Sequence, residues 1–178
     1  DYNHTGSSLS ARQLTVNNSS TLSITDNLLI VTESIYLESA NDEIRLIDSE
    51  GATPIGQSQL ITTHSNSTQV SGNGRLMVDQ NSENPSIYRY IYMGTPVNTI
   101  GGSTYTIASV MKDGSTPTST TSDITDMTFT ASHDGSPTSP ITISNRWIYT
   151  YGTSADWSQK GSTGAVSYTH LRAHETGY

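Results

Sequence analysis

The first half of the chain repeats one short pattern, in which two apolar residues flank a third residue and turn-forming residues follow. Such alternation places apolar side chains on one face of an extended strand and is the sequence signal of a half-buried β-strand. The first five units start 6 to 9 residues apart, and no stretch keeps helical apolar spacing for three turns. The pattern therefore predicts an all-β chain. The units are Leu14-Thr15-Val16, Leu22-Ser23-Ile24, Leu28-Leu29-Ile30, Ile35-Tyr36-Leu37, Ile44-Arg45-Leu46 and Leu76-Met77-Val78.

Short strands at this spacing form either a β-sandwich or the rungs of a β-solenoid. Each unit carries too little apolar surface to be buried alone, whereas stacked units share one continuous core. A narrow solenoid also suits a chain in which only 32% of the residues are hydrophobic. We therefore predict a short β-solenoid-like stack over residues 1–85.

The second half of the chain has a different composition, because both Trp residues and the single Phe lie beyond residue 86. The segments "YRYIYMGTPV" (88–97) and "RWIYTYG" (146–152) alternate aromatic residues with others. These segments predict two aromatic-faced strands, and the Gly, Pro and Ser content of residues 114–123 and 133–140 predicts loops. We interpret residues 86–165 as an antiparallel β-sandwich.

Charge and composition exclude several classes of function. The net charge is −8 and the only lysines are Lys112 and Lys160, so the chain lacks the basic surface that nucleic acid or an anionic membrane requires. The chain has no Cys, which excludes disulfides, Cys-based zinc sites and a Cys nucleophile. The longest wholly apolar run covers residues 28–31, too short to insert into a membrane.

Polar residues offer few catalytic or metal-binding candidates. His133 and Asp134 could belong to a catalytic triad, but no Gly-x-Ser-x-Gly elbow is present, and we interpret His133-Asp134-Gly135 as a solvated turn. We expect no cofactor, although the turns at residues 26–27 and 41–42 carry Asp and Asn that could hold calcium. The carboxylates of the first half predict a solvated acidic face rather than a glycosidase pair. They are Glu33, Glu38, Asp42 and Glu43.

The aromatic residues of the second half allow two interpretations. Exposed Tyr and Trp rings can stack on sugars, and Trp147, Tyr149 and Trp157 are the candidates for glycan stacking. Alternatively, Tyr90, Trp147 and Tyr149 fill the core of a sandwich that is otherwise short of apolar volume. Alternation along a strand turns half of such residues inward, so the core interpretation is favoured.

Longer segments resemble a known family. "YRYIYMGTPV", "VMKDGSTPTS" and "ITISNRWIYTYGTSADWSQKGSTG" resemble a recurrent part of large secreted surface proteins of Bacteroidetes, which typically end in a type IX secretion sorting domain. "LTVNNSSTLSITDNLLI" looks like the solenoid of the same family, so the resemblance covers residues 1–164. It implies export and a cell-surface or adhesin-like role, and it implies no catalytic residues. The family's Gly-Glu-Gly-rich strand and sorting domain are missing, so we expect a truncated sandwich.

The last residues are of a different kind. His170 and His174 are four apart, but a zinc site would need a helix, a third ligand and supporting hydrogen bonds, none of which the sequence predicts. Residues 166–176, "VSYTHLRAHET", instead resemble the translation of a transposase-based sequencing adapter. We therefore expect residues 166–178 to be an artefactual, disordered tail. We expect the chain to be a metagenomic fragment of a longer exported protein, with Ala165 as about its last natural residue.

Three functions remain as hypotheses. The first is a non-catalytic structural or adhesin-like segment of a secreted or cell-surface bacterial protein, with extracellular glycans or surface proteins as partners. The second is a carbohydrate-binding module of an exported polysaccharide-degrading enzyme. The third is a fragment of a solenoid-type glycan lyase or hydrolase, which would need a cluster of carboxylates or Arg along one solenoid face. No particular oligomeric state is indicated.

Overall fold

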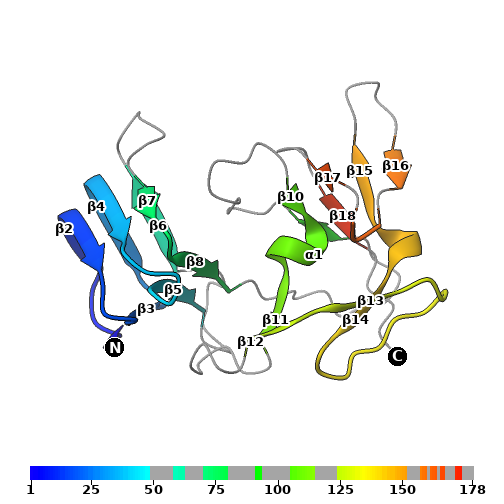
Figure 1. The fold of residues 1–178 in the computed structure, drawn as a ribbon, viewed down its shortest axis with the longest axis horizontal. Coiled ribbons are helices and arrows are strands. Elements are labelled where there is room, and N and C mark those ends of the chain that lie inside the picture. The colour runs from blue at the N-terminus through cyan, green and yellow to red at the C-terminus, as the bar shows by residue number, and fades with distance from the viewer. Residues whose placement is uncertain are drawn as a thin grey trace. The chain divides into compact units, whose positions relative to one another are not determined.

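A computed structural model describes residues 1–48, 58–62, 70–79, 91–93, 105–114, 124–151, 157–159, 161–163, 165–166 and 171–173. The described residues are mostly β-stranded, as predicted (Figure 1). The chain divides into two compact units, Asp1–Asn81 and Ser82–Tyr178. No helix in the described part of the chain is long and apolar enough to cross a membrane.

The first unit is built from two parallel sheets, and strands β1 to β6 enter them alternately (Figure 1). Up to β6, each strand therefore pairs with the strand two places along the chain, whereas β7 pairs with β4 and β8 pairs with β5, three places back. The first sheet contains β1 (Tyr2–His4), β3 (Thr21–Thr25), β5 (Glu43–Ile47) and β8 (Arg75–Val78), in that order. The second contains β2 (Leu9–Val16), β4 (Leu28–Leu37) and β6 (Gln59–Thr62), with β7 (Val70–Gly72) also pairing with β4.

The apolar positions of neighbouring strands lie opposite one another. Leu22 pairs with Ile44, and Ile44 pairs in turn with Leu76. In the second sheet, Leu29 lies between Leu9 and Leu60. In this register the apolar positions of paired strands lie on the same face of the sheet. The core therefore runs continuously through the stacked strands. The buried core residues are Val16, Leu22, Ile24, Leu29, Val31, Ile35, Leu37, Ile44 and Leu46.

The predicted units 28–30 and 35–37 are not separate strands, because both belong to β4. The four intervening residues, 31–34, contain no Gly, Pro or Asn that would form a turn, so the backbone stays extended. A register shift between Ala11 and Gln13 of β2 absorbs the mismatch between the two paired strands. A bulge of this kind lets both halves of each strand keep their apolar side chains inward.

The turn at Gly72-Asn73-Gly74 closes against the preceding layer of strands. The amide of Asn73 donates to the Leu37 carbonyl oxygen at 2.8 Å. Gly72 has φ of 101°, and a Cβ there would lie 1.9 Å from that same oxygen. A Cβ on Gly74 would lie 2.4 Å from the Asp42 carbonyl oxygen. Only glycine fits at either position, so the turn residues fix how closely successive layers approach.

The second unit contains smaller sheets around a separate core. β15 and β18 are central in the largest sheet, whose order is β16-β15-β18-β9 and whose pairs are antiparallel. The strands of this sheet are β9 (Ile91–Met93), β15 (Tyr149–Tyr151), β16 (Trp157–Gln159) and β18 (Leu171–Ala173). The others are β10 (Tyr105–Thr106), β11 (Lys112–Gly114), β12 (Ile124–Asp126), β13 (Thr128–Thr130), β14 (Thr142–Ser144) and β17 (Ala165–Val166). The helical elements are α1 (Ile107–Val110) and the 3-10 turn η3 (Asn145–Trp147). The buried core residues are Tyr105, Ile107, Ile143 and Ile148.

Two details of this unit differ from the prediction. β13 and β14 run parallel, with Phe129 opposite Ile143, whereas we expected antiparallel strands. The connection between them folds back at Ser136, which exchanges two backbone hydrogen bonds of 2.9 Å with Thr142, so the chain re-enters in its original direction. In addition, Trp147 lies in η3 and not in the predicted strand, because β15 begins only at Tyr149.

Two short segments near the end of the chain pair as strands, and the disorder expected for residues 166–178 as a whole stays a prediction. β17 pairs with β10, and β18 lies between β15 and β9, with Leu171 opposite both Thr150 and Met93. Backbone amides and carbonyls form such ladders whatever the side chains are, so a segment without a designed pattern can still complete a sheet. The adapter origin of residues 166–176 stays a prediction.

Candidate functional site

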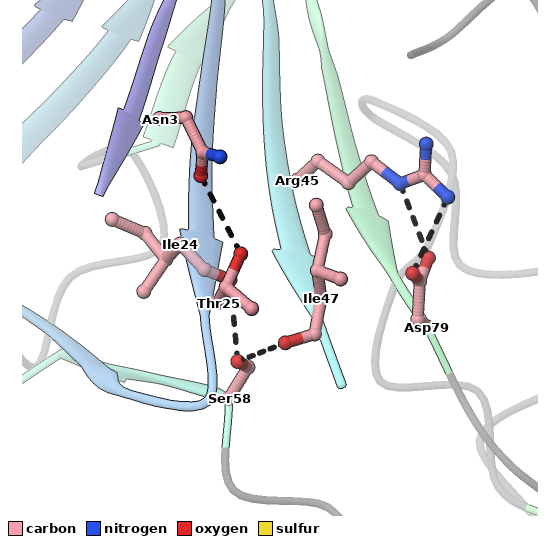
Figure 2. Close-up of polar contacts among 7 residues, drawn as sticks. All are labelled: Asn3, Ile24, Thr25, Arg45, Ile47, Ser58 and Asp79. Atoms are coloured by element: carbon pink, nitrogen blue, oxygen red, sulfur yellow. Dashed lines mark hydrogen bonds and ion pairs between the residues drawn. The ribbon is translucent and has the colours of Figure 1, made fainter. Parts of the chain in front are cut away.

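Charged side chains gather on β5 and β8 in the first unit. The Arg45 guanidinium contacts Asp79 through two hydrogen bonds of 3.3 Å each (Figure 2). Glu43 lies opposite Arg75 in the parallel register, and the Arg75 Nη2 atom is 3.7 Å from Glu43 Oε2. These residues form the kind of carboxylate and arginine cluster that a solenoid-type lyase or hydrolase would need.

Two members of this cluster are closed to solvent, whereas the Arg75 side chain is 52% exposed. Glu43 is 0% exposed and Arg45 is 1% exposed. Burial raises the pKa of Asp79 above its ordinary value, and the neighbouring Asp48 carboxylate adds to this, while the Arg45 guanidinium opposes it. Because Glu43 and Arg45 are buried and engaged with Arg75 and Asp79, these two charges serve to hold strands together and cannot touch a polysaccharide chain.

The predicted solvated acidic face is therefore wrong for Asp42 and Glu43, both of which are buried. Asp42 accepts hydrogen bonds from the amides of Ser20 at 3.0 Å and Ser39 at 2.5 Å. Burial acts to raise the pKa of Asp42, but these amide hydrogen bonds outweigh it and hold the pKa below its ordinary value. The carboxylate thus caps a turn, which favours a structural role over calcium binding. Within the described ranges, no three His, Asp or Glu side chains converge as metal ligands.

A hydroxyl bridge joins the first sheet to the segment that enters β6. Ser58 is buried, and its Oγ donates to the carbonyl oxygens of Ile24 and Ile47 (Figure 2). Its amide donates to the Asp48 carboxylate at 2.9 Å. Figure 2 draws this bridge and the Arg45–Asp79 pair together. These polar contacts supply stability and register, and they leave no reactive group exposed.

An open depression of about 470 Å³ lies on the second unit. It combines two aromatic rings with a cation and an amide, which is the mixture found in binding sites for polar ring-shaped ligands. Its lining residues are Ala131, His133, Asn145, Arg146, Trp147 and Tyr149.

Local structure explains why these side chains meet. η3 follows β14 directly, and the Ser144 hydroxyl caps it by accepting a hydrogen bond from the Arg146 amide at 3.3 Å. Ile148 is 1% exposed and anchors the segment in the core, so its neighbours Trp147 and Tyr149 are left near the surface. The Asn145 side chain accepts from the Ser162 amide at 2.8 Å and fixes the other end of the turn.

The loop that follows β13 holds two of the lining side chains in place. The Trp147 Nε1 atom donates to the His133 carbonyl oxygen at 2.8 Å, and the His133 ring packs edge-on against the indole with centroids 5.3 Å apart. The Arg146 Nε atom donates to the Ala131 carbonyl oxygen at 2.9 Å. The indole and the guanidinium are therefore positioned before any ligand arrives, which lowers the entropic cost of binding.

The structure brings together two of the three predicted glycan-stacking residues. Trp147 and Tyr149 line the depression, whereas only the backbone of Trp157 is described, in β16 opposite Tyr151. Sequence reasoning missed Arg146, although it directly precedes Trp147 in "RWIYTYG". His133 and Asp134 lie in an exposed loop, as the turn interpretation requires. Tyr90 lies outside the described residues.

Comparisons of the chain with protein families, curated proteins and solved structures found no match in any of the three. The resemblance to secreted Bacteroidetes surface proteins therefore stays a prediction. Function has to be inferred from the two sites themselves.

Proposed function

We propose that the chain is a non-catalytic, adhesin-like structural segment of a secreted or cell-surface bacterial protein. In this proposal the first unit is a short β-solenoid spacer and the second is a sandwich-like module. The supporting observation is the register of the first unit, in which Leu22, Ile44 and Leu76 repeat one apolar position on successive parallel strands. Stacking of this kind extends a chain in one direction, which is the geometry of a spacer.

The buried charges support a structural role over catalysis. A catalytic carboxylate or Arg has to touch its substrate, whereas Glu43 and Arg45 are shielded and Asp79 is held by Arg45. The strongest charge cluster among the described residues of the first unit is thus committed to holding β5 and β8 together. A spacer needs this cohesion and needs no cleft.

A second candidate function is a carbohydrate-binding module. It is favoured by one observation, that Trp147 and Tyr149 line the same open depression. Aromatic rings at the surface offer flat apolar faces to the C–H faces of a sugar ring, and nearby polar groups bind its hydroxyls. This function is compatible with the first, because an adhesive segment also needs a binding surface.

Incubation of the whole chain with immobilised plant, bacterial and animal polysaccharides tests both candidates. We expect saturable retention on at least one polysaccharide, with no new reducing ends and no unsaturated sugar products. Release of products would contradict the non-catalytic proposal. Absence of retention on every surface would contradict the adhesive and carbohydrate-binding roles alike.

A further inference from the structure

The depression on the second unit contains a cation whose role the fold does not explain. Arg146 is exposed and lies between Asn145 and Trp147 in η3, so its side chain contributes little apolar burial to the core. The described residues include four ion pairs, and none of them involves Arg146. The charge is therefore available to a ligand.

The one side-chain hydrogen bond described for Arg146 orients it usefully. Its Nε atom donates to the Ala131 carbonyl oxygen at 2.9 Å. The guanidinium is planar and has two edges that can form paired hydrogen bonds. Because Nε is engaged, the edge made by the two terminal nitrogens is the one left for a ligand. That edge matches the two oxygens of a carboxylate, which planar Arg binds through two parallel hydrogen bonds.

The aromatic rings restrict what can carry the carboxylate. Trp147 is fixed by its hydrogen bond to the His133 carbonyl oxygen, and Tyr149 lines the same depression. A ligand that meets both features needs a ring with an apolar face and a carboxylate on its edge. A sugar acid has this combination, because its ring hydrogens can cover an indole while its carboxylate reaches sideways.

We propose that the depression binds acidic saccharides, with a hexuronate ring against Trp147 and its carboxylate on the terminal nitrogens of Arg146. The inference rests on the proposed carbohydrate-binding role of the second unit and specifies its ligand class. The overall charge of −8 opposes anions at long range. Salt screens charges beyond about 8 Å at physiological ionic strength, so the local guanidinium determines which saccharide is retained.

Matched pairs of saccharides test the proposal on the whole chain. Titration calorimetry compares an oligogalacturonate with its methyl ester, and an oligoglucuronate with the neutral glucan of the same linkage. We expect at least one acid to bind roughly tenfold more tightly than its neutral partner, because a charge-assisted hydrogen bond contributes about 1.5 kcal/mol or more. The preference should shrink as salt is raised.

Variants assign the preference to its residue. Arg146→Gln should abolish the preference for the acid, because affinity for the acid should fall more than affinity for the neutral saccharide. An unchanged urea unfolding midpoint for this variant reports an intact fold. Arg146→Lys should restore part of the preference, because it keeps the charge without the planar fork. The matched control is Arg12→Gln, which removes an exposed arginine that pairs with Glu33 in the first unit and should change neither affinity.

The outcomes separate this proposal from the function on which it rests. Equal affinity for acidic and neutral saccharides would overturn the ligand class and leave the carbohydrate-binding role standing. No affinity for any saccharide would overturn both. A preference for sulfated over carboxylated saccharides at equal charge would overturn the hexuronate assignment, since the Arg146 guanidinium would then not select for a carboxylate. A preference for the acid that survives in Arg146→Gln would place the anion elsewhere.

Discussion

Arg45 in β5 and Asp79 beyond the end of β8 are joined by two hydrogen bonds of 3.3 Å, although 34 residues separate them in the chain. The Arg45 side chain is 1% exposed and the Asp79 side chain is 16% exposed. The pair therefore ties the chain that leaves β8 back to the strand on which β8 is stacked. Its burial makes the energetic consequence of removing either partner large.

Arg45→Met should lower the free energy of unfolding by about 3 kcal/mol, because it leaves the Asp79 carboxylate half of a broken buried pair. The double variant Arg45→Met with Asp79→Leu should be more stable than Arg45→Met alone, since no buried charge then remains. Urea unfolding followed by circular dichroism measures both changes. Arg12→Met is the control, because its ion pair with Glu33 is exposed, and it should change stability by less than about 1 kcal/mol. If Arg45→Met and Arg12→Met lowered the free energy of unfolding equally, the structural role of Arg45 would be contradicted.

The raised pKa of Asp79 predicts that the folded chain loses stability as the pH rises. Its pKa is raised above 3.8 in the folded chain, so the folded state holds the proton more tightly than the unfolded chain does. The stability contributed by this group is therefore complete below pH 3.8 and is lost as the pH rises through the folded-state pKa. Asp79→Asn should flatten this part of the profile of unfolding free energy against pH. A profile identical to that of the parent chain would count against the raised pKa.

The lowered pKa of Asp42 predicts the opposite dependence of stability on pH. Burial opposes ionisation, but the amide hydrogen bonds from Ser39 and Ser20 hold its pKa below 3.8 in the folded chain. Its contribution to stability is present above pH 3.8 and is lost as the pH falls through the folded-state pKa. Asp42→Asn should therefore reduce the acid-side decline, measured by urea midpoints across the acid range. The two variants should change the profile on opposite sides of pH 3.8.

The sequence predicted the strands of the first unit better than their connections. Period-two units such as Leu22-Ser23-Ile24 identify a buried face directly, because one physical cause, apolar burial, determines both pattern and structure. The merging of 28–30 and 35–37 into β4 depended on pairing with β2, whose register shift no local pattern reveals. The parallel sheet order likewise arises from contacts between strands distant in sequence.

The candidate sites were predictable only in part, because they depend on long-range contacts. Trp147 and Tyr149 stood out as aromatic residues near an alternating segment. Arg146 acquires its role from the Ala131 carbonyl oxygen, 15 residues earlier, and from the turn η3 that replaces the predicted strand there. The burial of Glu43 could not be predicted from the sequence either, because a charged residue at the start of a strand ordinarily faces water.

Gly72→Ala should destabilise the first unit by about 3 kcal/mol. The new Cβ would lie 1.9 Å from the Leu37 carbonyl oxygen, and φ of 101° is strained for any residue with a side chain. Gly6→Ala is the matched control, because the nearest heavy atom to its Cβ would be in the His4 ring at 3.6 Å, an ordinary contact. Chemical unfolding of both variants measures the difference. If Gly72→Ala unfolded at the same urea concentration as Gly6→Ala, the close approach of successive layers would be wrong.

Trp147→Ala should weaken saccharide binding roughly tenfold, because an aromatic contact contributes about 0.5–1.5 kcal/mol beyond its buried area. Trp147→Phe should keep most of the affinity, because it retains a flat ring. The small loss of affinity reflects the missing hydrogen bond from Nε1 to the His133 carbonyl oxygen. Affinity is measured by titration calorimetry, and unchanged urea midpoints show that the fold is intact. Trp157→Ala discriminates between the two tryptophans, because only Trp147 is known to line the depression. If Trp157→Ala removed binding and Trp147→Ala did not, the binding surface would lie on β16 and not in the depression.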